Sequence, residues 1–234
     1  TFVNKPQGLL VSGPELVLGI SSNQLINEGI LRPGGMQLAQ VGNLAGSFTQ
    51  TAQATAYSEL DFGSEVLDAI HMTGAAVLGG VADVSLLNPQ LVKPGHFQKS
   101  LFSADMGVTD AGMVLRTAPS VVIVYDVIYP NGLNAVLDYN VDFSPIGPGG
   151  PMDRNLREVG DYFNRIQDAG SSEALADTVV TLLYIPEFDE YRTAMSQLGP
   201  DFYGEHQAEL LRSSQRFNDT LLDGGAFRFM EQDM

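Results

Sequence analysis

Short apolar segments broken by glycine and proline dominate the first part of the chain. The stretch from Val66 to Gly95 contains three strand-like pieces with such boundaries: Asp68–Met72, Ala75–Leu78 and Val81–Leu86. Asp68–Met72 alternates between polar and apolar positions, Ala75–Leu78 is a short apolar patch, and Val81–Leu86 is a further run with Val81, Val84 and Leu86. Each piece is bounded by turn residues, as is typical of short strands. Strands this short cannot bury a face alone, so the pattern favours strands stacked on one another, as in a solenoid.

The same pattern extends from Thr1 to about Pro145, which predicts a segment made almost entirely of strands and loops. Further strands are expected at Leu9–Val11, Leu16–Leu18, Leu25–Ile26, Ile30–Leu31, Phe48–Thr51, Ala54–Phe62, Phe97–Phe102, Met113–Arg116, Val121–Tyr129 and Leu133–Val141. The tripeptide Pro130–Gly132 is expected to turn the last two strands against each other.

The composition changes between Ser144 and Pro151, where prolines and glycines rule out a helix and disfavour a central strand. We therefore divide the chain into residues 1–145, a β segment, residues 146–151, a Pro/Gly linker, and residues 152–234, a helical region. About four amphipathic helices are predicted in that region from apolar residues at three- and four-residue spacing. They are Asp153–Ala169, a helix from a cap at Ser171–Ser172 to Pro186, Phe188–Leu198, and Asp201–Leu222.

Charge and composition narrow the classes of partner. The 234 residues carry a net charge of -16, which would repel a polyphosphate, so nucleic acid is not expected as a partner. The chain has no cysteine, which excludes disulfides and thiolate metal sites. Its most apolar run, Val121–Tyr125, falls far short of the roughly 20 residues of a membrane helix.

Residues that carry catalytic chemistry are few. The histidines His71, His96 and His206 are far apart in sequence and form no H-E-x-x-H motif, so packing or exposure explains each of them better than metal binding. No G-x-S-x-G motif is present, and Ser171–Ser172 is better explained as a helix cap.

Acidic and glycine-rich positions add no site. The carboxylates Asp61, Asp83 and Asp138 are scattered, as expected by chance in an acidic protein. Gly79–Gly80 and Gly147–Gly150 lack the features of a phosphate-binding loop. We therefore expect no catalytic, cofactor-binding or metal-binding residues, and no cofactor.

The order of motifs along the chain resembles the membrane-proximal end of the passenger of a bacterial type V autotransporter. The segment Asn27–Gly35 is similar to an N-x-G-x-L-x-P-G rung of that family, and Asp68–Gly80 to its D-x-I-x-V-x-G-x-A-x-L-G-G rung. Gly46–Thr51 with Tyr57–Phe62 is similar to the rung between them. Leu198–Tyr203 and Ala208–Leu222 resemble the segment that leads into the family's β-barrel.

This resemblance implies a right-handed parallel β-helix, the autochaperone region of the passenger, followed by a helical linker to the barrel. It implies a location at the outer membrane and cell surface of a Gram-negative bacterium. The implied partners are upstream passenger rungs, the chain's own β-barrel translocator and the barrel assembly machinery. We expect the chain to be an excised fragment without the barrel, and its uncovered helical stripes to favour self-association. Some members of this family cleave their own chain at an asparagine in the corresponding helix. Here Asn218 is followed by Asp219 rather than by a second asparagine, so we do not expect cleavage at this position.

The function expected from these observations is a non-enzymatic stalk that nucleates folding of the passenger and links it to the barrel. Two alternatives remain open at this stage. The first is an adhesin-type surface for a host protein or glycan, which clustered exposed aromatic residues would support. The second is a polysaccharide-active β-helix enzyme, which would need a groove lined by acids such as Asp61, Asp83, Asp105 and Asp110.

Overall fold

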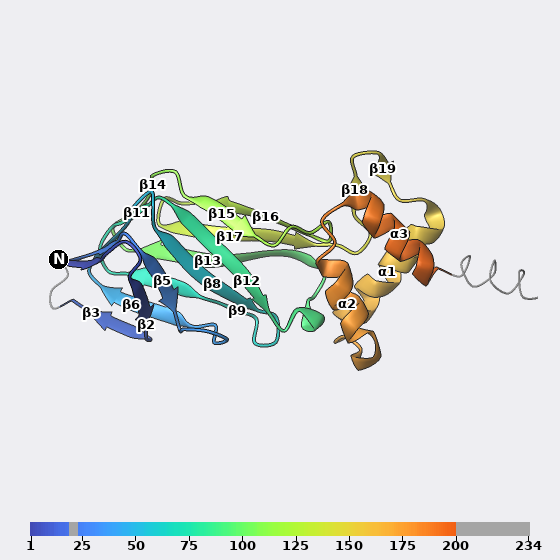
Figure 1. The fold of residues 1–234 in the computed structure, drawn as a ribbon, viewed down its shortest axis with the longest axis horizontal. Helices are drawn as coiled ribbons and strands as arrows, with labels where there is room; N and C mark the ends of the chain where they lie inside the picture. Colours follow the sequence, from blue (N-terminus) through green and yellow to red (C-terminus); the bar gives the residue numbers. More distant parts are fainter. Residues whose placement is uncertain (19–22, 200–234) are drawn as a thin grey trace, which may run out of the picture.

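The computed structural model describes residues 1–18 and 23–199. The described chain is mainly β, with three large sheets and a set of helices that follow them. In Figure 1 the N-terminus lies at one end of the molecule and the helices lie at the other end. The fourth predicted helix, Asp201–Leu222, lies outside the described residues, as do His206 and Asn218.

Sheets A and B gain their strands in chain order, and sheet C does so up to β13. The first sheet, A, is β1 (Phe2–Asn4), β4 (Gln24–Asn27), β7 (Ser47–Gln50), β11 (Ala76–Leu78) and β14 (Val108–Asp110). Sheet B is β2 (Leu9–Ser12), β5 (Ile30–Pro33), β8 (Thr55–Asp61), β12 (Val81–Leu87) and β15 (Val114–Thr117), with β9 (Val66–Leu67) beside β8. Sheet C is β3 (Glu15–Val17), β6 (Val41–Ala45), β10 (Ala69–Met72), β13 (Gly95–Ala104), β17 (Asn134–Val141) and β16 (Ile123–Ile128).

The chain visits sheets A, B and C in the same order five times. We call each of the first four sets of three strands a rung, because in the fifth set, β14–β15–β16, the sheet C strand pairs antiparallel. The rungs are β1–β2–β3, β4–β5–β6, β7–β8–β10 and β11–β12–β13. Neighbouring rungs pair in parallel in all three sheets. The three pieces predicted between Val66 and Gly95 therefore belong to three different sheets. Parallel sheets with helices at the C-terminal end confirm the coarse expectation from the sequence.

The interior is filled by rows of apolar side chains that repeat from rung to rung. Three such rows, with every member at most 2% exposed, are Leu25–Phe48–Ala76 from sheet A, Leu31–Ala56–Ala82 from sheet B, and Leu44–Met72–Ala104 from sheet C. Across the interior, the Phe48 and Phe102 rings stack with centroids 5.8 Å apart. The short strands are therefore stable only as a stack, because each one covers its neighbours' apolar side chains.

An antiparallel hairpin follows the last parallel strands. Strand β16 pairs antiparallel with β17 along its whole length, as the predicted Pro130–Gly132 turn requires, and β17 also pairs antiparallel with β13. The Gly132 carbonyl at the hairpin tip accepts a hydrogen bond from the Val108 N–H of β14, at 2.7 Å. Strand β15 contacts β16. The hairpin therefore lies against the last strands of sheets A and B.

Three α-helices match the first three predicted helices: α1 (Arg154–Asp168), α2 (Ala176–Leu183) and α3 (Phe188–Leu198). Short 3-10 turns, η1 (Pro89–Leu91) and η2 (Glu173–Leu175), precede β13 and α2. The Asp153 side chain caps α1 by accepting the Leu156 N–H at 3.2 Å. The predicted cap at Ser171–Ser172 is wrong in detail, because Ser172 precedes η2 but its side chain makes no capping hydrogen bond.

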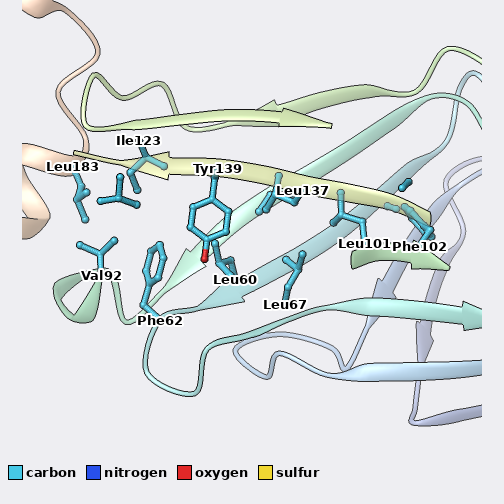
Figure 2. Packing of buried hydrophobic residues seen from close by; sticks show 14 of the residues in the cluster. Leu60, Phe62, Leu67, Val92, Leu101, Phe102, Ile123, Leu137, Tyr139 and Leu183 are labelled. Atoms are coloured by element: carbon cyan, nitrogen blue, oxygen red, sulfur yellow. The ribbon is translucent and has the colours of Figure 1, made fainter. Parts of the chain in front are cut away.

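The helices pack on the end of the β segment. Gln167 of α1 donates from its Nε2 to the carbonyls of Gln90 and Val92, both at 2.9 Å, and the Tyr191 hydroxyl of α3 donates to the Phe143 carbonyl at 2.6 Å. Figure 2 shows Leu183 of α2 near Val92 and Ile123, and all three belong to the same buried apolar cluster. One apolar cluster therefore extends from the sheets into the helices.

The predicted linker is itself structured. Residues 146–151 contain a small hairpin, β18 (Ile146–Gly147) and β19 (Gly150–Pro151), and a Cβ on Gly147 would lie 2.3 Å from the Phe188 ring of α3. The division at residues 145 and 151 stays a prediction. The strands that the sequence did not predict are β1, β6, β9 and β14, which are short or contain glycine or asparagine, and the two strands of this hairpin, β18 and β19.

Candidate functional site

The first strand of each large sheet has a paired neighbour on one side only among the described residues. These strands, β1, β2 and β3, together form a surface that we call the open edge. Four apolar side chains on them are 49% or more exposed: Phe2 at 49%, Leu9 at 61%, Val11 at 52% and Val17 at 67%. Unpaired strand edges of this kind are templates for further strand pairing.

Three side-chain amides are stacked in register beside this edge, at the corner between sheets A and B. Asn4 pairs with Asn27, and Asn27 pairs with Gln50. All three are buried, at 7%, 0% and 1% exposure. We call this set the amide column. Buried amides are costly unless their hydrogen bonds are made, so the column is stable only because its donors have partners.

The amides follow one hydrogen-bonding rule. Asn4 Nδ2 donates to the carbonyl of Ile30, the first residue of β5, at 2.8 Å. Asn27 Nδ2 donates to Thr55, the first residue of β8, at 3.4 Å, and Gln50 Nε2 donates to Val81, the first residue of β12, at 3.2 Å. Asn4 Nδ2 also donates to Asn27 Oδ1 at 2.8 Å. Each amide therefore reaches the start of the sheet B strand in the next rung.

A second buried polar group lies at the corner between sheets B and C. Asp68 is completely buried and Glu59 is 8% exposed. Asp68 Oδ1 accepts the Gln40 N–H at 2.5 Å, its Oδ2 accepts the Glu59 N–H at 2.9 Å, and Glu59 Oε2 accepts the Leu38 N–H at 3.0 Å. The two carboxylates therefore hold the loop between β5 and β6.

The environment of Asp68 changes its acidity. Burial raises the pKa of Asp68 to about 7, although the N–H donors of Gln40 and Glu59 oppose this; the Glu59 charge raises the pKa further and the Arg32 charge lowers it. In the unfolded chain the Asp68 carboxyl has its ordinary pKa, near 3.8. The native state therefore holds more protons than the unfolded state between pH 4 and pH 7 or so, and the free energy of unfolding falls as pH rises through this window.

Replacing Asp68 with asparagine is expected to remove this part of the pH dependence. The amide has only one acceptor oxygen for two N–H donors, so the variant should lose about 1–3 kcal/mol at pH 5. The loss should shrink or reverse at pH 8, where the native aspartate is ionised. Urea unfolding at both pH values measures the difference. Asp83→Asn is the control, because Asp83 lies near the surface in an ion pair with Arg116 at 2.6 Å. An unchanged pH slope in Asp68→Asn would contradict this account.

The structure also brings together a serine, a histidine and an aspartate that sequence reasoning did not connect. His71 of β10 is in register with Ser103 of β13; His71 Nδ1 lies 3.0 Å from Ser103 Oγ, and His71 Nε2 lies 3.4 Å from Asp105 Oδ1. Only the parallel register places these residues side by side. Such a serine, histidine and aspartate set acts in hydrolysis when a cleft and oxyanion donors accompany it. Here the Asp105 side chain is 58% exposed, so water competes for the ion pair.

The other candidate acids have separate partners. Asp61 accepts from the Asn88 side chain at 2.7 Å, Asp138 pairs with His96 at 2.7 Å, and Asp110 forms a local turn with the Gly112 N–H at 2.8 Å. Asp61 and Asp83 are on sheet B, whereas Asp110 is on sheet A. Ion pairing and turn formation account for these carboxylates without a shared site.

Aromatic residues gather at the end of sheet C nearest the helices. The Tyr139 ring lies 5.3 Å from Phe97, 6.2 Å from Tyr125 and 6.4 Å from Phe62, measured between centroids. Figure 2 shows Phe62 and Tyr139 within the packed interior. A cavity beside them has a volume of about 20 Å³, which is room for a single water. The cluster is therefore part of the core.

The glycine-rich segments that the sequence analysis considered as phosphate-binding loops form turns in the structure. Gly79 and Gly80 form the turn between β11 and β12, and Gly147–Gly150 belongs to the β18–β19 hairpin. No group of three or more His, Cys, Asp or Glu residues in ranges 1–18 and 23–199 is arranged to hold a metal ion. Within the same ranges, no helix is both long and apolar enough to cross a membrane.

Comparison of the sequence with protein-family models found no match, and comparisons with curated proteins and with solved structures found none either. The open edge, with the amide column beside it, is our candidate interaction surface, because its three strands are each unpaired on one side among the described residues.

Proposed function

We propose that this chain is a right-handed parallel β-helix that acts as a non-enzymatic stalk and folding segment of a type V autotransporter passenger. In this proposal the four rungs stack below further rungs of the passenger. The helices lead toward the β-barrel in the outer membrane of a Gram-negative bacterium, where the barrel assembly machinery is a further partner.

The observation that carries the proposal is the position of β1, β2 and β3. All three stand at the ends of their sheets, so a new rung can pair with all three sheets at once. The opposite side of the stack differs, because the β16–β17 hairpin lies against β14 and β15 and turns the strand direction around. This asymmetry supports growth of the stack from one side only. The order of motifs along the sequence supports the same assignment.

The absence of a shared cleft for the candidate acids agrees with a structural role more readily than with polysaccharide chemistry. Four aromatic residues that an adhesin-type surface could use, Phe62, Phe97, Tyr125 and Tyr139, instead pack against one another. A stalk needs neither feature. It needs rungs that nucleate quickly and a cap that prevents pairing in the wrong direction, and a hairpin can supply that cap.

A display experiment tests the proposal. The chain is placed between a reporter domain and a β-barrel translocator in a Gram-negative cell, and the protease-accessible reporter is measured. We expect more surface reporter with the chain than without it. Leu31→Asp should abolish the gain, because Leu31 is completely buried and an unpaired buried charge costs several kcal/mol.

The control for display is Val124→Asp, since Val124 is 65% exposed and tolerates a charge. Equal surface reporter with and without the chain would refute the folding role. Equal loss in Leu31→Asp and Val124→Asp would indicate a nonspecific effect of added charge.

A further inference from the structure

The amide column defines which rung fits on the open edge. Asn4 uses its Nδ2 to reach both Asn27 Oδ1 and the Ile30 carbonyl, each at 2.8 Å. Asn4 is the first member of the column, so in this arrangement its own Oδ1 and the carbonyl of Leu9, the first residue of β2, are the equivalent acceptors on the open side. An amide one rung upstream would meet both acceptors.

The backbone repeats the same pattern. The Glu28 N–H donates to the Asn4 carbonyl at 2.8 Å, and the Thr51 N–H donates to the Asn27 carbonyl at 3.0 Å. The Ile30 N–H donates to Gly8, and the Thr55 N–H donates to Gly29. One rung upstream, the equivalent donors are the N–H groups of Lys5 and Leu9. Their acceptors would come from the rung that occupies the edge.

The apolar residues of the edge set a second requirement. Phe2, Leu10 and Leu16 are in register with the buried Leu25, Leu31 and Leu44. They are the inward-facing residues of the first rung, and Phe2 is still 49% exposed. An occupant must therefore bring three apolar side chains into the interior as well as one amide at the corner.

We propose that the open edge selects a parallel rung that carries an asparagine or glutamine in register with Asn4, and that this amide donates to Asn4 Oδ1 and to the Leu9 carbonyl. This inference rests on the proposed function and names the partner that the edge accepts. A second copy of this chain meeting edge to edge through a twofold axis would place its strands antiparallel, which breaks the register that the amide column uses.

The chain supplies its own test rung. Gln24 is in register with Ser47, so residues 24–46 make one complete rung, and the residue after them begins the next rung. By the same register, a copy of residues 24–46 fused directly before Thr1 places the copied Asn27 over Asn4. The matched control is the same fusion with Asn27→Leu in the copy only, which keeps size and removes the amide. Neither change alters the native residues.

Hydrogen exchange measures the result. In the fusion, the Lys5 and Leu9 amides are expected to exchange more slowly than in the unfused chain. In the Asn27→Leu copy this protection should be about tenfold weaker, because the column loses buried hydrogen bonds. Amides of β8 should be unchanged in both, which confirms that the core remains folded.

The remaining outcomes separate the two proposals. Equal protection by both copies would overturn the role of the amide and leave the stacking function intact. No protection of Lys5 and Leu9 by either copy would overturn both, because the edge would then reject a rung made of its own sequence. Sedimentation of the unfused chain as a dimer with these amides already protected would identify a second copy as the occupant and overturn the inference.

Discussion

Replacing Phe48 with alanine is expected to lower the free energy of unfolding by about 3–5 kcal/mol. Phe48 is completely buried. It lies in the centre of the sheet A row, between Leu25 and Ala76, and stacks on Phe102 across the interior. Its removal leaves a cavity bounded by two rungs and by sheet C. The small Ala76 side chain on one side cannot fill that space, so little relaxation is expected.

Phe2→Ala is the matched control for Phe48→Ala. Phe2 pairs with Leu25, which pairs with Phe48, so both phenylalanines belong to one row. Phe2 is 49% exposed and should cost only about 1 kcal/mol, because it has less apolar area to lose. Urea unfolding followed by far-UV circular dichroism measures both. Similar losses for the two variants would mean that the first rung is as well covered as the third, which contradicts an open edge.

Gly80→Ala is the second substitution with a large expected effect, about 3 kcal/mol or more. Gly80 has a φ of +66°, and a Cβ there would lie 2.3 Å from the Ala54 carbonyl oxygen and 2.6 Å from that of Thr51. The left-handed conformation costs roughly 1–2 kcal/mol for alanine, and the contact with two backbone oxygens adds to it. The turn between β7 and β8, which carries these two carbonyls, would have to move away.

Gly132→Ala separates these two contributions. Gly132 has a φ of +67°, almost the same as Gly80, but a Cβ there meets nothing within 4 Å. It should therefore lose only the conformational part, about 1 kcal/mol or slightly more. Thermal and urea unfolding of both variants give the difference. If the two losses were equal, close approach of neighbouring rungs would have no energetic weight at Gly80.

The sequence predicted those elements whose pattern is local. The helices α1 and α3 were located to within a residue or so, because apolar spacing and the flanking Asp153 and Gly170 are read directly from neighbouring positions. The β16–β17 hairpin was also predicted, from one turn signal. By contrast, β6 was missed because Gly42 and Asn43 lie within it, and these residues usually indicate a turn.

The amide column was missed because asparagine beside a short strand usually indicates a turn, and because a single glutamine in a predicted strand, such as Gln50 in Phe48–Thr51, carries no sign of its partners. A signal was nevertheless present, because Asn4, Asn27 and Gln50 recur at one constant separation along the chain. The approach of His71 to Ser103 had no comparable signal. It depends on which strand lies beside β10, and that is a property of the register rather than of any local pattern.

The equivalence of the rungs has a consequence for damage at the open end. If the first rung were lost to a protease or to mechanical load, β4, β5 and β6 would form the new boundary. Leu25, Leu31 and Leu44 would then take the places of Phe2, Leu10 and Leu16, and Asn27 would take the place of Asn4. Loss of the first rung therefore shortens the molecule but leaves a boundary with three inward-facing apolar residues and an asparagine at the corner, as before.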